Sequence, residues 1–285
     1  MGNIVWLASY PKSGNTWLRA FIYNLIEQPA KPGRLTDLPG YFLDDSKPRW
    51  YQPYAGDRDL ASFSAEDIFA LRQQVQRDIA GSVAAGTVFT KTHSELGEFN
   101  GHPLINIQVT AGAIYIVRNP LDVVLSVADH FAISIDEAID FMGNPDTGAP
   151  TNEENVTTML GSWSTHVASW TNTGNRGILV LRYEDMLDRP QKAFLGVMKL
   201  LGLNKDPARL KRAIRFSEFR ELAAQESRDG FVERSPDAER FFRVGRKNQW
   251  RDVLSDEQVA RLVDDHYQQM ERFRYIPPRF RKPAT

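Results

Sequence analysis

Residues 4–17 of this chain read IVWLASYPKSGNTW, an apolar run that continues directly into a short polar loop. Ile4 to Ala8 lack the polar and apolar alternation of a half-exposed strand, which predicts a central strand of a parallel sheet. Thr16 to Glu27 then place apolar side chains three and four residues apart, which predicts an amphipathic helix. Open α/β sheets bind phosphorylated ligands at such loops. The stretch therefore predicts an α/β fold with an anion site after its first strand.

The alternation of strands and helices continues along the chain. Further strands are predicted at Thr87 to Thr90, Ala113 to Val117 and Ile178 to Leu181, and a second helix at Pro120 to Phe131. Strands that alternate with helices imply right-handed crossovers and a sheet covered on both faces. We therefore expect a single domain over residues 1–285, with a three-layer α/β/α architecture around a central parallel sheet, like that of P-loop nucleotide triphosphatases.

Composition excludes several classes of site and partner. The 35 basic and 36 acidic residues give a formal net charge of −1, so no global field attracts nucleic acid or anionic lipid. The absence of cysteine excludes disulfides, thiolate metal sites and cysteine nucleophiles. No apolar run is long enough for a membrane span, and the N-terminus has no secretory signal. These features predict a cytoplasmic protein that recognises anions locally, with no nucleic-acid partner and no membrane span.

The loop from Tyr10 to Trp17 offers the groups that bind a phosphate. Successive backbone N–H groups and the start of the following helix would face an anion, with hydroxyl donors from Ser13 and Thr16. Lys12 adds a positive charge, and Gly14 allows close approach of the backbone. In nucleotide triphosphatases the lysine directly follows the second glycine, whereas here Lys12 precedes Gly14 by two positions. The loop therefore does not fit the nucleotide triphosphatase pattern.

The loop resembles instead the 5′-phosphosulfate loop of the cytosolic and bacterial sulfotransferases. These enzymes use 3′-phosphoadenosine 5′-phosphosulfate (PAPS) and release adenosine 3′,5′-bisphosphate (PAP). Four further stretches resemble motifs of that family in order and spacing: Lys91 to His93, Tyr115 to Ser126, Tyr183 to Met186 and Phe241 to Trp250. The last departs from the family pattern, because Asn248 replaces a glycine and Gln249 a common aspartate. Together the stretches extend the resemblance over nearly the whole chain.

The resemblance implies a role for each matching residue. The 5′-phosphosulfate would be held by Lys12, Ser13, Gly14, Asn15 and Thr16. The 3′-phosphate would be held by Arg118, Ser126, Arg243 and Gly245. The adenine would lie between Trp17 and Phe216, with Tyr183 at its edge. Aromatic faces suit a flat base, and the planar fork of arginine suits a phosphate.

The resemblance also implies a mechanism. His93 would be the general base, a task that suits histidine because its unperturbed pKa lies near neutrality. Lys12, and Lys91 with it, would stabilise the negative charge that develops on the bridging oxygen as the S–O bond breaks. Nothing in the pattern calls for a metal. Without the resemblance, nothing in the sequence would distinguish His93 from His130.

Two other functions share this sequence pattern. One is a P-loop kinase-like nucleotide enzyme, in which Asp185 would be a magnesium ligand at a strand end. The other is a catalytically silent protein that binds PAPS or PAP. The displaced Lys12 argues against the kinase, and the presence of both Lys12 and His93 argues against the silent protein.

The acceptor is expected to be a small molecule bound between two stretches predicted as long loops, Pro29 to Phe63 and Gly143 to Asn155. Five aromatic residues of the first stretch could line an apolar pocket: Tyr41, Phe42, Trp50, Tyr51 and Tyr54. Alcohols, phenols, amines and glycans all fit this expectation, and the sequence leaves the oligomeric state open.

Overall fold

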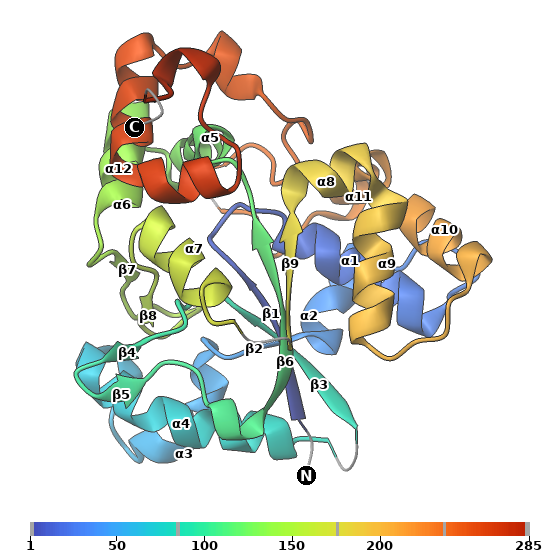
Figure 1. The fold of residues 1–285 in the computed structure, drawn as a ribbon. Coiled ribbons are helices and arrows are strands. Elements are labelled where there is room, and N and C mark those ends of the chain that lie inside the picture. Colours follow the sequence, from blue (N-terminus) through green and yellow to red (C-terminus); the bar gives the residue numbers. More distant parts are fainter. Residues whose placement is uncertain (1–2, 84–85, 175–176, 236–237, 283–285) are drawn as a thin grey trace.

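A computed structural model describes residues 3–83, 86–174, 177–235 and 238–282, and its centre is a parallel sheet (Figure 1). The strands lie in the order β2 (Leu43–Asp44), β3 (Thr87–Thr92), β1 (Asn3–Ser9), β6 (Thr110–Val117) and β9 (Ile178–Arg182). Every neighbouring pair is parallel. Since β1 pairs with β3 on one side and β6 on the other, the chain changes direction across the sheet beside β1. Ligands bind at such a switch point, beyond the carboxyl ends of the strands.

Helices cover both faces of the sheet (Figure 1). One face is covered by α3 (Gln52–Ala55), α4 (Ala65–Gly81), α5 (Pro120–Phe131), α6 (Ile135–Gly143), α7 (Trp163–Thr171) and α12 (Asp256–Arg272). The other face is covered by α1 (Asn15–Glu27), α2 (Leu38–Tyr41), α8 (Tyr183–Asp188), α9 (Pro190–Leu200), α10 (Pro207–Phe216) and α11 (Phe219–Asp229). The predicted three-layer α/β/α architecture is confirmed.

The alternation of side chains along a strand explains the two cores. In β6 the side chains of Ala113, Tyr115 and Val117 pack against the first group of helices. Those of Ile114 and Ile116 point the other way and pack against the second group. Because both sets are apolar, β6 reads as an unbroken hydrophobic run, which is what the sequence showed.

The stretch from Pro29 to Phe63 is not the long loop that was predicted. It contains β2, which pairs with the outer edge of β3, together with α2, α3 and three short 3-10 helices: η1 (Leu35–Asp37), η2 (Pro48–Trp50) and η3 (Leu60–Ser62). In the second predicted loop, β7 (Gly148–Ala149) pairs with β8 (Thr158–Met159). Elements of two to four residues have no periodicity to detect, so the sequence did not reveal them.

The remaining elements are short and connect the larger ones. They are β4 (Glu98–Phe99), β5 (His102–Pro103), η4 (Ile107–Val109), η5 (Gln249–Asp252) and η6 (Pro278–Phe280). Among the residues that the structure describes, no helix combines the length and the apolar character needed to cross a bilayer.

Candidate active site

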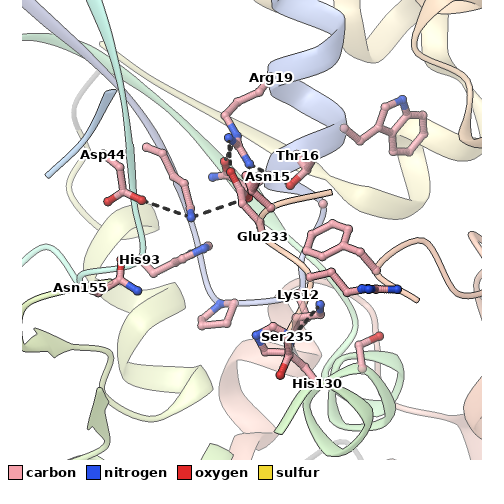
Figure 2. A pocket seen from close by; sticks show the side chains of 18 of the residues that line it. Lys12, Asn15, Thr16, Arg19, Asp44, His93, His130, Asn155, Glu233 and Ser235 are labelled. Carbon is pink, nitrogen blue, oxygen red and sulfur yellow. Dashed lines mark hydrogen bonds and ion pairs between the residues drawn. The ribbon is translucent and has the colours of Figure 1, made fainter. Parts of the chain in front are cut away.

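A cavity of about 940 Å³ lies beyond the carboxyl ends of the central strands (Figure 2). Twelve of the fourteen residues that the sequence singled out line it: Lys12, Gly14, Asn15, Thr16, Trp17, Lys91, His93, Arg118, Ser126, Tyr183, Arg243 and Gly245. Ser13 and Phe216 are both buried and do not line it. Residues separated by more than two hundred positions thus meet in one cavity.

The loop after β1 presents a cation that lies against neutral groups. Lys12 itself has a left-handed backbone, with φ of 64°. Its Nζ lies 3.5 Å from Nδ1 of His130 and 4.3 Å from the centre of the Phe241 ring. Burial lowers the pKa of Lys12 to about 8, and burial together with Lys12 lowers that of His130 to about 4. The imidazole is therefore neutral near pH 7, and Lys12 is poised to meet an anion.

The side chains at the start of α1 are engaged within the protein. Asn15 Nδ2 donates to the carbonyl of Leu7 at 2.8 Å. Arg19 donates from Nε to Asn15 Oδ1 at 3.1 Å and from Nη2 to Thr16 Oγ1 at 2.8 Å. Gly14, the N-cap of the helix, provides no side-chain cap. The first turn therefore presents its backbone N–H groups to the cavity, where they can bind an anion.

The buried polar atoms at this loop that have no hydrogen-bond partner in the described parts of the chain include Ser13 Oγ and Arg118 Nε. Buried polar groups are almost always paired, so such atoms mark a place where a ligand can bind. Arg118 also donates from Nη1 to the Lys12 carbonyl at 2.8 Å, and the same atom lies 3.5 Å from Ser126 Oγ. Arg118 and Ser126 are thus brought together next to the loop, as the resemblance implied.

The stretch before η5 approaches the cavity from the opposite side. Arg243 donates to Gln249 Oε1 at 3.2 Å, so the glutamine provides an acceptor where the family commonly has aspartate. Asn248 adopts φ of 62°, a left-handed conformation that asparagine tolerates better than most residues, and so replaces the usual glycine. Asp122 of α5 accepts the backbone N–H groups of Asn248 and Trp250, at 2.7 and 3.2 Å, which fixes this stretch against the helix.

Two glycines let aromatic rings pack directly against the backbone. A Cβ on Gly14 would lie 2.8 Å from the ring of Tyr183, and one on Gly245 would lie 2.2 Å from the ring of Phe219. Both glycines have positive φ, of 105° and 64°. The Trp17 ring lies near Tyr183 in an edge-on arrangement, with centroids 5.7 Å apart. Trp17, Tyr183 and Phe219 therefore surround a part of the cavity that suits a flat base.

The structure does not place Phe216 in that group. Phe216 ends α10 and is buried outside the cavity lining, whereas Phe219, at the start of α11, lines it. The two lie three residues apart on either side of the break at Ser217 and Glu218. No periodic feature of the sequence assigns one of them to the cavity, because the break between the helices changes the direction of the side chains.

His93 follows β3 directly, and its ring orientation is fixed. Nδ1 lies 2.7 Å from the backbone carbonyl of Ser9. A carbonyl can only accept, so Nδ1 carries the hydrogen and Nε2 remains an acceptor. Burial, assisted by the charge of Lys91, lowers the pKa of His93 to about 4. His93 is therefore a neutral imidazole whose Nε2 can receive a proton.

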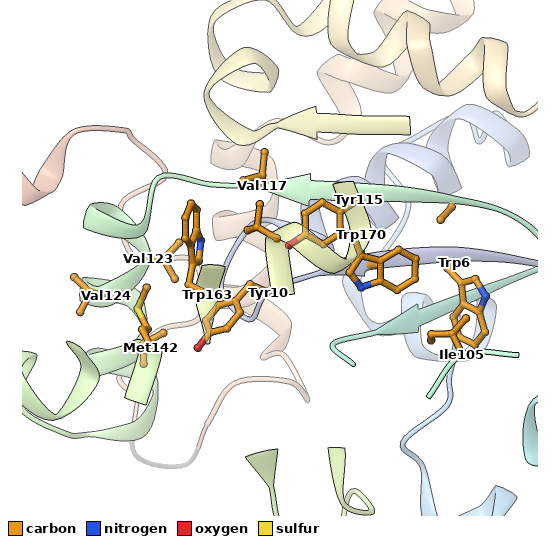
Figure 3. Packing of buried hydrophobic residues seen from close by; sticks show 14 of the residues in the cluster. Trp6, Tyr10, Ile105, Tyr115, Val117, Val123, Val124, Met142, Trp163 and Trp170 are labelled. Carbon is orange, nitrogen blue, oxygen red and sulfur yellow. The ribbon is translucent and has the colours of Figure 1, made fainter. Parts of the chain in front are cut away.

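A buried network supports the backbone of His93. Its carbonyl lies 3.1 Å from Nε2 of His166, whose Nδ1 lies 2.8 Å from the hydroxyl of Tyr115. Tyr115 stacks on Trp170 in the apolar core, with ring centroids 6.0 Å apart (Figure 3). His93 thus rests on packed residues of β6 and α7. His166 is therefore a structural histidine.

The structure adds two residues to the site that sequence reasoning missed, Arg19 and Glu233. They form a bidentate ion pair, with N–O distances of 2.7 and 2.6 Å, and the side chain of Arg19 is 1% exposed (Figure 2). Although burial opposes it, the charges of Arg19 and Lys91 hold the pKa of Glu233 well below its usual range. No local signal could have revealed the pair, because its members are 214 residues apart.

Lys91 lies between two carboxylates. Its Nζ is 3.3 Å from Asp44 and 3.9 Å from Glu233. The pairing of β2 with β3 places Asp44 directly beside Lys91. Because Arg19 also holds Asn15 and Thr16, the ion pair connects the loop after β1 to Lys91 and to the stretch that leads to Arg243.

The wall between the two predicted loops is polar rather than aromatic. Of the five aromatic residues expected there, Phe42 alone lines the cavity. The hydroxyls of Tyr41, Tyr51 and Tyr54 bond to Glu27, to the Asp45 carbonyl and to Asp78. The polar lining of this wall comes from Asp44, Asp45, Ser46, Lys47, Arg49, Asn152, Glu153, Glu154, Asn155 and Thr158. Asp185, the magnesium ligand of the kinase-like alternative, pairs with Arg189 at 2.9 Å and does not line the cavity.

Comparison with known proteins places this geometry in a family. The Sulfotransferase domain model matches residues 3–274. The chain is 24% identical to Sulfotransferase 1A1 of Canis lupus familiaris over 273 residues. This alignment covers 93% of this chain and 82% of that protein. Two solved structures have similar folds. Mouse sulfotransferase SULT7A1 complexed with PAP has a TM-score of 0.60 and 19% identity, with 94% of this chain and 84% of that chain covered. Retinol dehydratase in complex with androsterone and PAP has a TM-score of 0.65 and 17% identity, with 94% and 80% covered.

Proposed function

This chain belongs to the sulfotransferase family, and on that premise we propose that it transfers the sulfuryl group of PAPS to a hydroxyl or amine of a small-molecule acceptor. One observation carries the proposal. A neutral imidazole with a free Nε2, that of His93, lies in the same cavity as the cationic loop of Lys12 and the pair Arg118 and Ser126. A proton acceptor and an anion site in one cavity are what transfer between a nucleotide and a nucleophile requires.

The residues of the cavity fit PAPS as donor. The unpartnered Ser13 Oγ and Arg118 Nε offer buried donors, and Gly14 and Gly245 let the cavity-lining rings of Tyr183 and Phe219 pack against the backbone. We assign the 5′-phosphosulfate to Lys12, Ser13 and the backbone N–H groups of Gly14, Asn15 and Thr16. We assign the 3′-phosphate to Arg118, Ser126, Arg243 and Gly245. We assign the adenine to Trp17, Tyr183 and, in place of Phe216, Phe219. PAPS supplies a sulfuryl group activated by its anhydride bond to the 5′-phosphate.

In the proposed reaction His93 Nε2 takes the proton of the acceptor hydroxyl. The oxygen attacks sulfur, an O–S bond forms, and the bond from sulfur to the 5′-phosphate oxygen breaks, with PAP as leaving group. Lys12 and Lys91 stabilise the negative charge on the oxygen that leaves. The low pKa of His93 in the ligand-free protein keeps the imidazole neutral. The anionic donor would raise that pKa and so strengthen the base.

The family model and both cores of the sheet also support one domain for the whole chain. The chain would then contain donor and acceptor sites in the same cavity, and the acceptor would be recognised by the wall formed by residues 44–49 and 152–158.

Replacement of His93 tests the proposed base. His93→Ala should lower sulfate transfer from PAPS to a panel of alcohols, phenols and amines by about 10²- to 10⁴-fold. Affinity for PAP, measured by calorimetry, should stay within about twofold, because His93 is not among the phosphate ligands. His102→Ala is the matched control, since His102 lies in β5 and outside the cavity lining. A His93→Ala enzyme that keeps normal turnover would remove His93 from this role.

The same calorimetry tests the donor. PAP should bind much more tightly than Mg-ATP, because Arg118, Ser126 and Arg243 have a partner in the 3′-phosphate that ATP lacks. Tighter binding of Mg-ATP would contradict the proposed donor and favour the kinase-like alternative.

A further inference from the structure

The acceptor class can be inferred from the polar wall of the cavity, an inference that rests on the proposed function. Two segments form this wall, residues 44–49 after β2 and residues 152–158 before and within β8. They are bonded to each other: Val156 donates its backbone N–H to the Ser46 carbonyl at 2.8 Å, and Lys47 Nζ donates to the Glu154 carbonyl at 3.3 Å. The wall is therefore assembled before any acceptor binds, and its polar groups have defined positions.

Asn155 is the centre of this wall. Its Oδ1 accepts a hydrogen bond from Lys47 Nζ at 3.0 Å. It also lies 3.0 Å from Ser46 Oγ, whose one hydrogen has a closer acceptor in Asp44 Oδ1, at 2.6 Å. An ammonium can only donate, so the Asn155 atom that faces Lys47 is the amide oxygen. The Nδ2 group, with two N–H donors, has no partner within the described residues, and Asn155 lines the cavity. The ammonium of Lys47 therefore sets the orientation of the amide, which leaves Asn155 as a hydrogen-bond donor toward the acceptor.

Several contacts hold the segment that carries Asn155 beside the residues at the end of β3. Arg72 donates to Ser94 Oγ at 3.0 Å and to the Thr157 carbonyl at 2.8 Å, and Glu95 donates its N–H to the Met159 carbonyl at 3.1 Å. The segment that carries Asn155 therefore runs beside the residues that follow His93. Asn155 and His93 also lie at the same side of the cavity in Figure 2, next to Asp44.

We propose that the acceptor carries a second oxygen near its reacting hydroxyl, as a sugar, a polyol or their ethers do. The reacting hydroxyl donates to His93 Nε2, and the neighbouring oxygen accepts from Asn155 Nδ2. Lys91 adds a further N–H donor between Asp44 and Glu233 for this oxygen pair. An isolated alcohol or phenol leaves the Asn155 donors unpaired on binding, and an unpaired buried donor costs affinity.

Matched acceptors test the proposal. 2-Methoxycyclohexanol and 2-ethylcyclohexanol have the same size and differ by one oxygen, and 2-methoxyphenol and 2-ethylphenol form the equivalent aromatic pair. With PAPS as donor, the wild-type enzyme should have a kcat/KM about tenfold higher for the methoxy member of at least one pair, the factor that one hydrogen bond contributes.

The variant Asn155→Asp removes the proposed hydrogen bond to the acceptor and leaves the contacts that hold the wall in place. It keeps an oxygen that accepts from Lys47, but it replaces the two N–H donors by a second acceptor. We expect it to abolish or invert the preference for the methoxy compound, with PAP affinity unchanged. Asn152→Asp is the matched control, because it makes the same chemical change on the same segment. The oxygen that it keeps, Oδ1, accepts hydrogen bonds from the backbone N–H groups of Glu154 and Asn155. It should keep the preference.

The outcomes distinguish failure of the proposed acceptor class from failure of the proposed sulfotransferase function. Equal kcat/KM for both members of each pair in the wild type, or a preference that survives Asn155→Asp, overturns the acceptor class and leaves the sulfotransferase function in place. Failure to transfer sulfate to any acceptor, together with failure to bind PAP, overturns the proposed function, and the acceptor class with it.

Discussion

Burial of the ion pair between Arg19 and Glu233 predicts how much stability the protein loses when one partner is replaced. Arg19 is 1% and Glu233 22% exposed, and the guanidinium donates two hydrogen bonds to the carboxylate. Arg19→Met fills much of the same volume but leaves the carboxylate with Lys91, at 3.9 Å, as its nearest cation. Removal of one partner of a buried pair destabilises a protein by about 3–5 kcal/mol. We expect Arg19→Met to lower the free energy of unfolding by about 3 kcal/mol.

The double variant distinguishes the pair from the loss of two separate side chains. Glu233→Gln alone leaves Arg19 buried without a counter-charge, and Arg19→Met with Glu233→Gln leaves no buried charge at this point. The double variant should therefore be much less destabilised than the sum of the single variants, with a coupling energy of about 2 kcal/mol. Urea unfolding at neutral pH measures all three. Arg261→Met is the control, because Arg261 pairs with Asp136 and Asp140 at the surface and should cost less than about 0.5 kcal/mol.

The stabilisation by the Arg19–Glu233 ion pair should also depend on pH, in a direction set by the pKa of Glu233. The pKa of Glu233 is lower in the folded protein than the value of about 4.3 that an unfolded glutamate has. Its contribution to stability is therefore complete above that unfolded pKa and is lost as pH falls through the folded pKa. The difference in stability between wild type and Glu233→Gln should shrink below about pH 4. A coupling energy indistinguishable from zero, or a cost of Arg19→Met no larger than that of Arg261→Met, would refute the reasoning.

Two further predictions concern the donor site and the base. Phe219→Ala should weaken PAP binding by about 1–3 kcal/mol, the contribution of one base–aromatic stack. Phe216→Ala should instead lower the stability of the fold and leave PAP affinity unchanged. Calorimetry measures the affinity and thermal unfolding the stability, and the reverse pattern would restore Phe216 to the site. In the ligand-free protein the imidazole signals of His93 in NMR should titrate near pH 4, because burial and Lys91 disfavour the charged form. A midpoint at or above about pH 6.5, the value of an unperturbed histidine, would contradict the neutral imidazole.

The sequence alone determined the parts of this protein whose chemistry is local. Apolar runs such as Ala113 to Val117 are buried on both faces, so they identify central strands without knowledge of their neighbours. The loop from Tyr10 to Trp17 contains its cation, its hydroxyls and its glycine within eight residues, so the sequence by itself predicts an anion site there. Lys12, His93 and Arg118 each follow a central strand, and parallel strands bring their carboxyl ends to one edge.

Only the tertiary structure decided the features that depend on distant partners or on the direction of a side chain. Arg19 and Glu233 are 214 residues apart in the sequence, and no residue next to either of them indicates that they form a pair. Phe216 and Phe219 differ in position because a break between two helices redirects the second ring. The direction of the Asn155 amide is set by a donor from another segment, Lys47. Local sequence determines which groups are present, whereas burial and hydrogen bonding across the fold determine where they point.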